Sequence, residues 1–260
     1  MKPTARNKPK SKTSTVKTVA NSGVKRKRKS TEIVVSDVHS RGHIKAKRSA
    51  KPMNRLSADF FNNKSCVDLA KALLGQILCR RLSPNGQTLK ATIVETEAYL
   101  GAEDKASATY NGRRTEHLEP LYMTRGTCFV YMTYGMYHCM NLSADGNGNA
   151  VLLRAVQPID GLDQMQSLRA KCRKTGTDTP YKQTLLANGP SKLCMAMDID
   201  RHNINKVNIT DSELIWLETG STVSDDDIVC TKRIGIDRAK EWANKPLRFY
   251  IKDNEYISKK

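Results

Sequence analysis

The sequence lacks any long apolar run. No stretch approaches the roughly 20 consecutive apolar residues that a membrane-spanning helix needs. The chain also lacks a charged start followed by an apolar segment, which is the pattern of a secretory signal peptide. We therefore expect neither a membrane helix nor a secretory leader, and no membrane among the partners.

Closely spaced cysteine pairs are also missing. The seven cysteines, an odd number, lie at positions 66, 79, 128, 139, 172, 194 and 230, and no two of them have C-x-x-C spacing. A zinc site is therefore not expected, and the pattern is typical of buried thiols in a reducing compartment. We expect no metal and no other cofactor.

The first 55 residues lack aromatic side chains and contain few acids. They hold 17 Lys and Arg residues against two Asp and Glu, a formal charge of +15, whereas the whole chain carries +18. Such a segment cannot bury enough apolar surface to offset its ordering entropy. Residues 1–55 are therefore predicted to form a disordered basic tail, and residues 56–260 a single folded domain.

The run KRKRK at residues 25–29 is the densest basic cluster of this tail. It favours nuclear import or anchoring to DNA, and incidental solvated charge is the alternative. The first 31 residues also contain no acid, which is typical of a mitochondrial transit peptide, although they lack its apolar periodicity. The predicted location is the nucleus, with the mitochondrion as a second location.

The remaining chain alternates between strand and helix patterns. Helices are expected at about 66–75, 160–173 and 189–197, and strands at about 76–82, 88–100, 128–143 (two strands broken at Tyr134-Gly135), 150–156 and 246–252. Asn85-Gly86 predicts the turn of a strand pair. The polar segment 101–126 is longer than an ordinary connection, and such loops are usually functional. The mixture predicts an α+β fold with a mainly antiparallel sheet.

One predicted strand, ATIVETEAYLG at 91–101, contains two acids. Regular alternation would place Glu95, Glu97 and Tyr99 on one face together with Ile93. A buried carboxylate costs several kcal/mol unless it is paired or hydrogen-bonded. The pair could be the two carboxylates of a sugar hydrolase, or one acid could be structural and paired with an arginine.

Aromatic residues near this strand favour a different chemistry. Tyr131, Tyr134 and Tyr137 crowd the predicted hairpin, and Asn141 and Arg154 follow on the next strands. Bases stack on aromatic rings, and an enzyme that acts on a base must first take it out of the duplex. Tyrosines beside one acid therefore indicate a pocket for a flipped nucleobase.

Five stretches carry a specific resemblance: VETEAYLGAED, FVYMTYGMYHCMN, VLLRAV, GPSKLC and KPLRFY. In these stretches and their order, the chain from about residue 57 to the end resembles the alkyladenine (3-methyladenine) DNA glycosylase family. The resemblance implies a single compact domain whose curved, mainly antiparallel sheet is flanked by helices and carries a protruding β-hairpin. The implied partner is double-stranded DNA that contains damaged purines, and the implied assembly is a monomer.

The resemblance also implies the chemistry. Glu97 matches the family's general base, which activates the water that attacks C1′ of the deoxyribose. Arg154 matches the partner of that water, and Glu95 is left as structural. The quoted motifs contain no candidate amine nucleophile, which is typical of a monofunctional enzyme that leaves an abasic site without cutting the strand. The expected substrates are 3-methyladenine, 7-methylguanine, hypoxanthine and ethenoadenine, excised at the start of base excision repair.

The pocket and wedge residues are matched in the same way. Tyr99 and Tyr131 match the two rings that stack on the flipped base, and Asn141 matches the residue that crowds the 2-amino group of guanine. Tyr134 matches the side chain wedged into the duplex. The residues expected to contact the DNA backbone are Lys192, Arg169 and Arg201.

Two departures from the family pattern leave lesion preference open. Ala108 stands where the family has a histidine that lines the base pocket, and His117 in TEHL replaces an arginine that contacts the backbone. Three functions are therefore compared: excision of damaged purines, binding of DNA or damage with much reduced turnover, and a carbohydrate hydrolase that uses Glu95 and Glu97. Retention of Glu97 and Arg154 favours excision, because a pure binder need not keep a desolvated acid.

Overall fold

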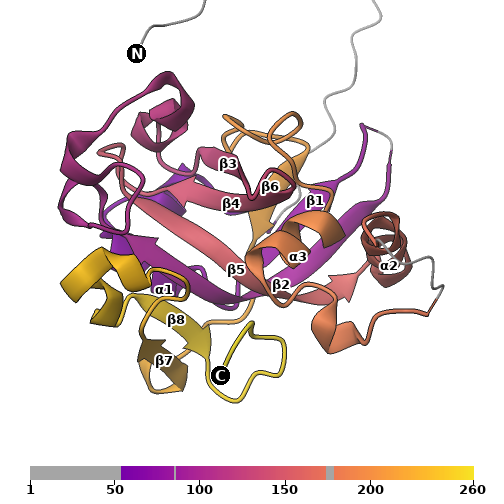
Figure 1. The fold of residues 1–260 in the computed structure, drawn as a ribbon. Helices are drawn as coiled ribbons and strands as arrows, with labels where there is room; N and C mark the ends of the chain where they lie inside the picture. The colour runs from indigo at the N-terminus through magenta and orange to yellow at the C-terminus, as the bar shows by residue number, and fades with distance from the viewer. Residues whose placement is uncertain (1–53, 85, 174–178) are drawn as a thin grey trace, which may run out of the picture. The chain divides into compact units, whose positions relative to one another are not determined.

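The structure is a computed structural model that describes residues 54–84, 86–173 and 179–260. The predicted tail lies outside these residues except for its last two, so its disorder and its boundary stay predictions. The described residues form an α+β fold in which helices pack against a curled antiparallel sheet (Figure 1). None of the helices in the described ranges has both the length and the apolar content to cross a membrane.

The sheet contains the eight strands found in the described residues. They are β1 (Ile77–Arg81), β2 (Thr88–Tyr99), β3 (Cys128–Thr133), β4 (Tyr137–Ser143), β5 (Ala150–Asp160), β6 (Ile215–Glu218), β7 (Ile228–Thr231) and β8 (Arg248–Ile251). The hydrogen-bonded order is β3-β4-β5-β2-β1-β6, and β8 pairs with both β2 and β7. Each of these strand pairs is antiparallel, which confirms the predicted sheet.

The described residues also contain three α-helices that accompany this sheet. They are α1 (Cys66–Ala72), α2 (Leu162–Lys171) and α3 (Pro190–Ala196), at the positions that the sequence predicts. Leu69 of α1 and Leu193 of α3 lie in the main core with Leu153 of β5. The Ser65 hydroxyl accepts a hydrogen bond from the backbone N–H of Asp68 and so caps the start of α1.

Short 3₁₀-helices fill several connections. They are η1 (Ala58–Phe61), η2 (Gly101–Glu103), η3 (Tyr110–Gly112), η4 (Glu116–Tyr122), η5 (Gln183–Leu185), η6 (Asp225–Asp227) and η7 (Asp237–Asn244). Three of them lie in the polar segment 101–126, which is therefore a folded connection between β2 and β3. Strands β6 and β7 were not predicted, because they have only four residues each and show no clear alternation.

The β3–β4 hairpin ends in a tight turn at Tyr134 and Gly135. Both residues have positive φ, +52° and +69°, and the N–H of Met136 donates to the carbonyl of Thr133 at 3.2 Å. Positive φ at both central residues is the requirement of a type I′ turn, and a tyrosine rarely adopts it. Tyr134 is 87% exposed, so the turn holds a large ring out in solvent.

Candidate active site

Strand β2 does not alternate regularly through its two glutamates. Its pairing with β5 is irregular between Ile93 and Thr96, and Ile93 lies in the main core together with Ala98. The predicted common face of Ile93, Glu95 and Glu97 is therefore wrong. The irregularity changes which residues of the strand meet the core, as β-bulges do, and this leaves both glutamates on the opposite side.

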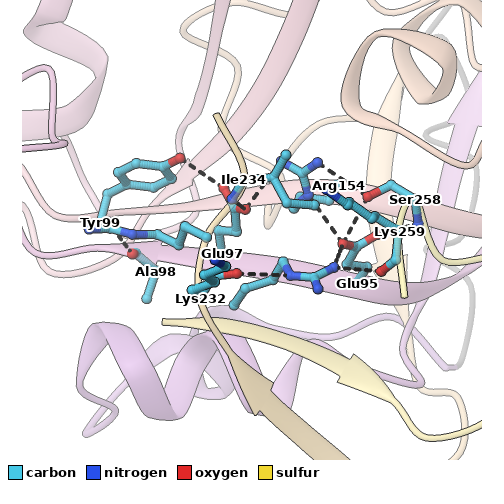
Figure 2. Close-up of polar contacts among 11 residues, drawn as sticks. Glu95, Glu97, Ala98, Tyr99, Arg154, Lys232, Ile234, Ser258 and Lys259 are labelled. Atoms are coloured by element: carbon cyan, nitrogen blue, oxygen red, sulfur yellow. Dashed lines mark hydrogen bonds and ion pairs between the residues drawn. The ribbon is translucent and has the colours of Figure 1, made fainter. Parts of the chain in front are cut away.

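Glu97 is fully buried and accepts from three different parts of the chain. The Tyr99 hydroxyl donates to Oε2 at 2.8 Å, and the backbone N–H of Ile234 donates to Oε1 at 2.9 Å. Arg154 Nη1 lies 3.2 Å from Oε1. Figure 2 shows the carboxylate between Tyr99 and Arg154, with Ile234 beside it. These contacts fix the orientation of the carboxylate.

Burial raises the pKa of Glu97 above its ordinary value near 4.5. Arg154, the Ile234 N–H and the Tyr99 hydroxyl act in the opposite direction, since each stabilises the ionised form. A carboxylate with a raised pKa is a stronger base than an ordinary glutamate. The site therefore presents a positioned base, with the proton affinity that general-base catalysis needs.

Arg154 on β5 bridges the two glutamates of β2. Its Nη1 faces Glu97, and its Nε lies 3.2 Å from Glu95 Oε1. Both carboxylates are completely buried, and the arginine is nearly so. The expected pairing of Arg154 with Glu97 is present, and Arg154 also holds Glu95, which the sequence analysis left without a reactive partner.

A cavity of about 700 Å³ opens next to Glu97. Among the residues that line it are Tyr99, Ala108, Tyr131, Tyr134, Asn141 and Arg154. Residues predicted from four separate stretches of sequence thus surround one space, which has the size of a small-molecule site. Glu97 is not part of this lining, but it contacts two residues that are, Tyr99 and Arg154.

The wall of this cavity is aromatic and ordered by internal contacts. The rings of Tyr131 and Phe129 are stacked with centroids 5.4 Å apart. The side-chain amide of Asn141 donates to the Phe129 carbonyl at 3.2 Å, so its orientation is fixed. Burial raises the pKa of both Tyr99 and Tyr131, so each hydroxyl keeps its proton. Neutral tyrosine rings are suited to stacking on a planar ligand.

Arg233 supports Tyr99 from outside the cavity. Its guanidinium lies 4.6 Å from the centre of the Tyr99 ring and is not part of the cavity lining. It pairs with Asp104 at 2.5 and 2.9 Å and donates to the Ala98 carbonyl at 2.9 Å. Both charged side chains are completely buried. The pair thus ties Tyr99 to the loop that begins at Gly101.

The two departures from the family pattern both face this cavity. Ala108 and His117 are exposed residues of its lining, and the His117 ring packs edge-on against Phe129 at 5.4 Å. Tyr110, two residues after Ala108, is not part of the lining. The space left by the alanine is therefore not refilled by that ring.

The three residues predicted to bind the DNA backbone differ in accessibility. Arg201 is exposed, and Lys192 is half-buried with its ammonium donating to Asn188 at 2.8 Å. Burial, with the nearby charge of Arg169, lowers the pKa of Lys192. Arg169 is only 6% exposed and lies over the Tyr181 ring at 4.6 Å. This arrangement gives the prediction for Arg169 no support, since the side chain offers little surface to DNA.

Several residues of the site were missed from the sequence. Ile234, Gly235 and Ile236 line the cavity, and Arg248 and Ser258 contact Glu95. Arg248 lies in the stretch KPLRFY, so that motif was a usable signal for it. Ile234 acts through its backbone N–H, and Ser258 through its backbone N–H as well as its hydroxyl; backbone groups leave no trace in side-chain patterns.

Within the described ranges, no three His, Cys, Asp or Glu side chains are grouped so that they could hold a metal ion. The polar groups that meet at the site are a carboxylate, an arginine and tyrosines. Together these groups define a pocket that could hold an aromatic ring against a buried base, which is the arrangement of a hydrolase for a planar substrate.

Comparison with known proteins shows to which family within this class of hydrolases the chain belongs. A model of the family described as methylpurine-DNA glycosylase (MPG) matches residues 59–255. The chain is 51% identical over 193 residues to the "Probable DNA-3-methyladenine glycosylase" of Encephalitozoon cuniculi (strain GB-M1), covering 74% of this chain and 88% of that protein. It is 44% identical over 207 residues to the "DNA-3-methyladenine glycosylase" of Homo sapiens, covering 79% of this chain and 68% of that protein. The chain belongs to the methylpurine-DNA glycosylase family.

Proposed function

We propose that this protein is a monofunctional DNA glycosylase that flips a damaged purine out of duplex DNA and hydrolyses its N-glycosidic bond. The observation that carries the proposal is the buried Glu97, held by Arg154 and Ile234 behind a cavity walled by Tyr99 and Tyr131. The family membership and the names of the two relatives support the same reaction class.

In the proposed reaction a water molecule is the nucleophile. Glu97 takes a proton from the water while the oxygen forms a bond to C1′ of the deoxyribose. The bond between C1′ and the purine nitrogen breaks, and its electron pair leaves with the base. Arg154 keeps Glu97 ionised before the step and in position during it. The described cavity lining contains no lysine, which supports a water mechanism over a Schiff base.

The aromatic walls favour purines with altered electronic structure. A purine stacked between Tyr99 and Tyr131 gains stacking energy on both of its faces. A cationic methylpurine is attracted in addition to the negative face of an aromatic ring. We propose 3-methyladenine, 7-methylguanine, hypoxanthine and ethenoadenine as substrates. Asn141, whose amide is fixed by the Phe129 carbonyl, is the residue proposed to reject the 2-amino group of guanine.

Tyr134 is proposed as the wedge that fills the space left by the flipped base. It lines the mouth of the cavity and is exposed at the tip of a protruding hairpin, with Met132 and Met136 exposed beside it. Apolar and aromatic wedges of this kind offset the few kcal/mol needed to unstack a base. Such a role explains a large ring in a turn conformation that tyrosine rarely adopts.

The test is excision from short duplexes that contain hypoxanthine or ethenoadenine. We expect a free base and an abasic site, seen as strand cleavage only after alkaline treatment. Cleavage without alkali, or a borohydride-trapped protein–DNA adduct, would contradict the water mechanism. Binding of the damaged duplex with no release of base would instead favour the binding protein with much reduced turnover.

We further propose that the protein acts as a monomer in the nucleus, guided by the cluster at residues 25–29. The basic stretch of the first 55 residues would add affinity for DNA, because lysine and arginine displace counterions from phosphate. Fluorescence microscopy of the full chain and of a variant with alanines at 25–29 tests the location. Unchanged nuclear accumulation of the variant would contradict it.

A further inference from the structure

Glu95 is contacted by four donor groups, one more than the proposed base two residues away. Its Oε1 accepts from Arg248 Nη1 at 2.7 Å, from the Ser258 hydroxyl at 2.9 Å and from Arg154 Nε at 3.2 Å. Its Oε2 accepts from the backbone N–H of Ser258 at 2.6 Å. Figure 2 shows this carboxylate surrounded by donors on the side away from Tyr99. Glu95 is thus held by two strands and by the segment near residue 258.

The partners of Glu95 also contact, directly or through one neighbour, the groups that donate to Glu97. Arg154, held through its Nε by Glu95, presents Nη1 to Glu97, and its Nη2 donates to the Ser258 hydroxyl at 3.2 Å. Arg248, also held by Glu95, donates through Nε to the Lys232 carbonyl at 3.1 Å. Lys232 lies two residues before Ile234, whose N–H donates to Glu97. Two of the three donors to Glu97 therefore depend on contacts that Glu95 makes.

The charges of the cluster balance only when Glu95 is present. Two carboxylates, Glu95 and Glu97, face two guanidinium groups, Arg154 and Arg248, in a fully buried space. Without Glu95, Arg248 would lose its carboxylate partner, and Arg154 would lose the contact that fixes its Nε. An arginine released in this way would no longer hold one fixed position beside the base.

We propose that Glu95 is a positioning residue for the reaction. It fixes the donors that orient Glu97, one through Arg154 and the other through Arg248 and the segment 232–234. Ser258 holds Glu95 in position. This inference rests on the proposed function of Glu97 as the general base. It assigns a function to the second acid of the strand and to a segment about 160 residues away in sequence.

The charge of Glu95 allows the positioning role to be measured, because a residue with only a structural role would not change the pH dependence of the excision rate. The negative charge of Glu95 is one of the influences that raise the pKa of Glu97. Glu95→Gln removes that charge and nearly keeps the shape, but it also releases Arg154 and the 232–234 segment, whose donors lower the pKa of Glu97 more strongly than Glu95 raises it. The acid limb of the pH–rate profile should then shift to higher pH, while the plateau rate falls because Arg154 and the 232–234 segment lose their fixed positions.

The test uses the full chain and single-turnover excision from a hypoxanthine duplex, with rates expressed per folded molecule. We expect Glu95→Gln to be at least ~10-fold slower than the wild type, as expected when a catalytic group is misplaced. Ser258→Ala, which loses the hydroxyl but keeps the backbone N–H, should be roughly threefold slower. Ser258→Thr, which keeps both donors, should restore the rate.

Glu218→Gln is the matched control. Glu218 is also a buried carboxylate in a strand, paired with Lys90 at 2.6 Å and with the Trp216 indole at 3.0 Å, and it does not contact the site. Its loss should lower stability without changing the rate per folded molecule or the acid limb. Rates for Glu95→Gln and Ser258→Ala within twofold of this control would overturn the proposal. If Glu95→Gln fails to fold, Ser258→Ala against Ser258→Thr decides.

The proposed function can fail separately from this inference. If Glu97→Gln keeps a rate near that of the wild type, the assignment of the base is wrong whatever the other variants do. If Glu97→Gln is inactive while Glu95→Gln and Ser258→Ala behave like the control, only the positioning role is lost.

Discussion

Glu97 behind the cavity and Tyr134 at its mouth have opposite surroundings. Glu97 has no exposed surface and is contacted by Tyr99, Ile234 and Arg154, whereas Tyr134 is 87% exposed at the tip of a hairpin. We call the first region, formed by Glu95, Glu97 and Arg154, the floor of the site, and Tyr134 with Gly135 its tip. The floor is fixed by many partners, and the tip by the geometry of a turn.

This difference follows from what each region is proposed to do. A general base must be oriented before the substrate arrives, and a low-dielectric, fully partnered surrounding supplies that orientation. A wedge must enter a DNA duplex, so it has to project from the protein surface and have no competing partner. Changes at the floor should therefore alter rate and stability, whereas changes at the tip should alter flipping alone.

The largest stability effect is expected for Arg233→Met, next to the floor. This change leaves Asp104 buried without its partner and removes the cation from behind the Tyr99 ring. Breaking a buried ion pair in this way typically costs about 3–5 kcal/mol. Chemical denaturation should show a loss in this range. The double variant with Asp104→Asn should recover part of it, since no unpaired charge is left, and a loss below about 1 kcal/mol would mean that the pair does not hold the floor.

The pH dependence of excision tests how the buried surroundings of the floor affect Glu97. Because burial raises the pKa of Glu97, the base is protonated at a pH where an ordinary glutamate is still ionised. The excision rate should fall about tenfold per pH unit below this raised pKa. The protonated form is also favoured by folding, so the stabilisation from Glu97 is present at low pH and is lost as pH rises through the folded pKa. Glu97→Gln should thus be more stable than the wild type at neutral pH, and an acid limb at ordinary glutamate values would contradict this account.

Tyr134→Asn is expected to affect flipping without affecting the fold. Asparagine adopts positive φ more readily than most residues, so the turn should remain while the wedge is lost. A fluorescent base reporter should show a flipped population roughly tenfold smaller, because the unstacking energy is no longer offset. The melting temperature should stay within about 1 °C of the wild type, as expected for an exposed site. Unchanged flipping would assign the wedge to another residue.

The smallest effect is expected for Ala108→His, at the wall between floor and tip. An imidazole facing the open space at Ala108 should add a stacking contact worth about 1 kcal/mol to a flipped ethenoadenine. Excision of cationic methylpurines should change less, since their glycosidic bond is already weak. Competition binding measures the difference. Weaker binding by Ala108→His, together with weaker binding by Tyr110→Ala, would show that Tyr110 fills the space when DNA is bound.

Local patterns predicted the elements of this fold well. The helical spacing in 66–75 and the break at Tyr134-Gly135 gave α1 and the β3–β4 hairpin, because each follows from a pattern within one short segment. The short strands β6 and β7 were not predicted, since they are defined by pairing with β1 and β8 rather than by their own residues. The irregularity in β2 was missed for the same reason, and with it the true face of Ile93.

For the candidate site as well, local sequence patterns indicated individual side chains but not partners that are distant in the sequence. Side chains with a recognisable chemistry, such as Glu97, Arg154 and Tyr131, were singled out from the sequence; Arg154 and Tyr131 line one cavity, and Glu97 contacts Arg154 behind it. The partners of Glu95 were not found, because Ser258 lies 163 residues away and contacts it through a backbone N–H as well as a hydroxyl. Arg169 was predicted to contact the DNA backbone; its guanidinium lies over the Tyr181 ring, a position set by tertiary packing that no local pattern indicates.

The most direct test of the central claim is single-turnover excision by Glu97→Gln, measured together with its affinity for the same damaged duplex. The glutamine keeps the shape of the floor but cannot take the proton from water. The account predicts that excision falls at least ~100-fold, the usual order for loss of a general base, while binding of the lesion stays close to that of the wild type. Excision within a few fold of the wild type, with the protein folded and bound, would contradict the claim and direct attention to Glu95 as the base.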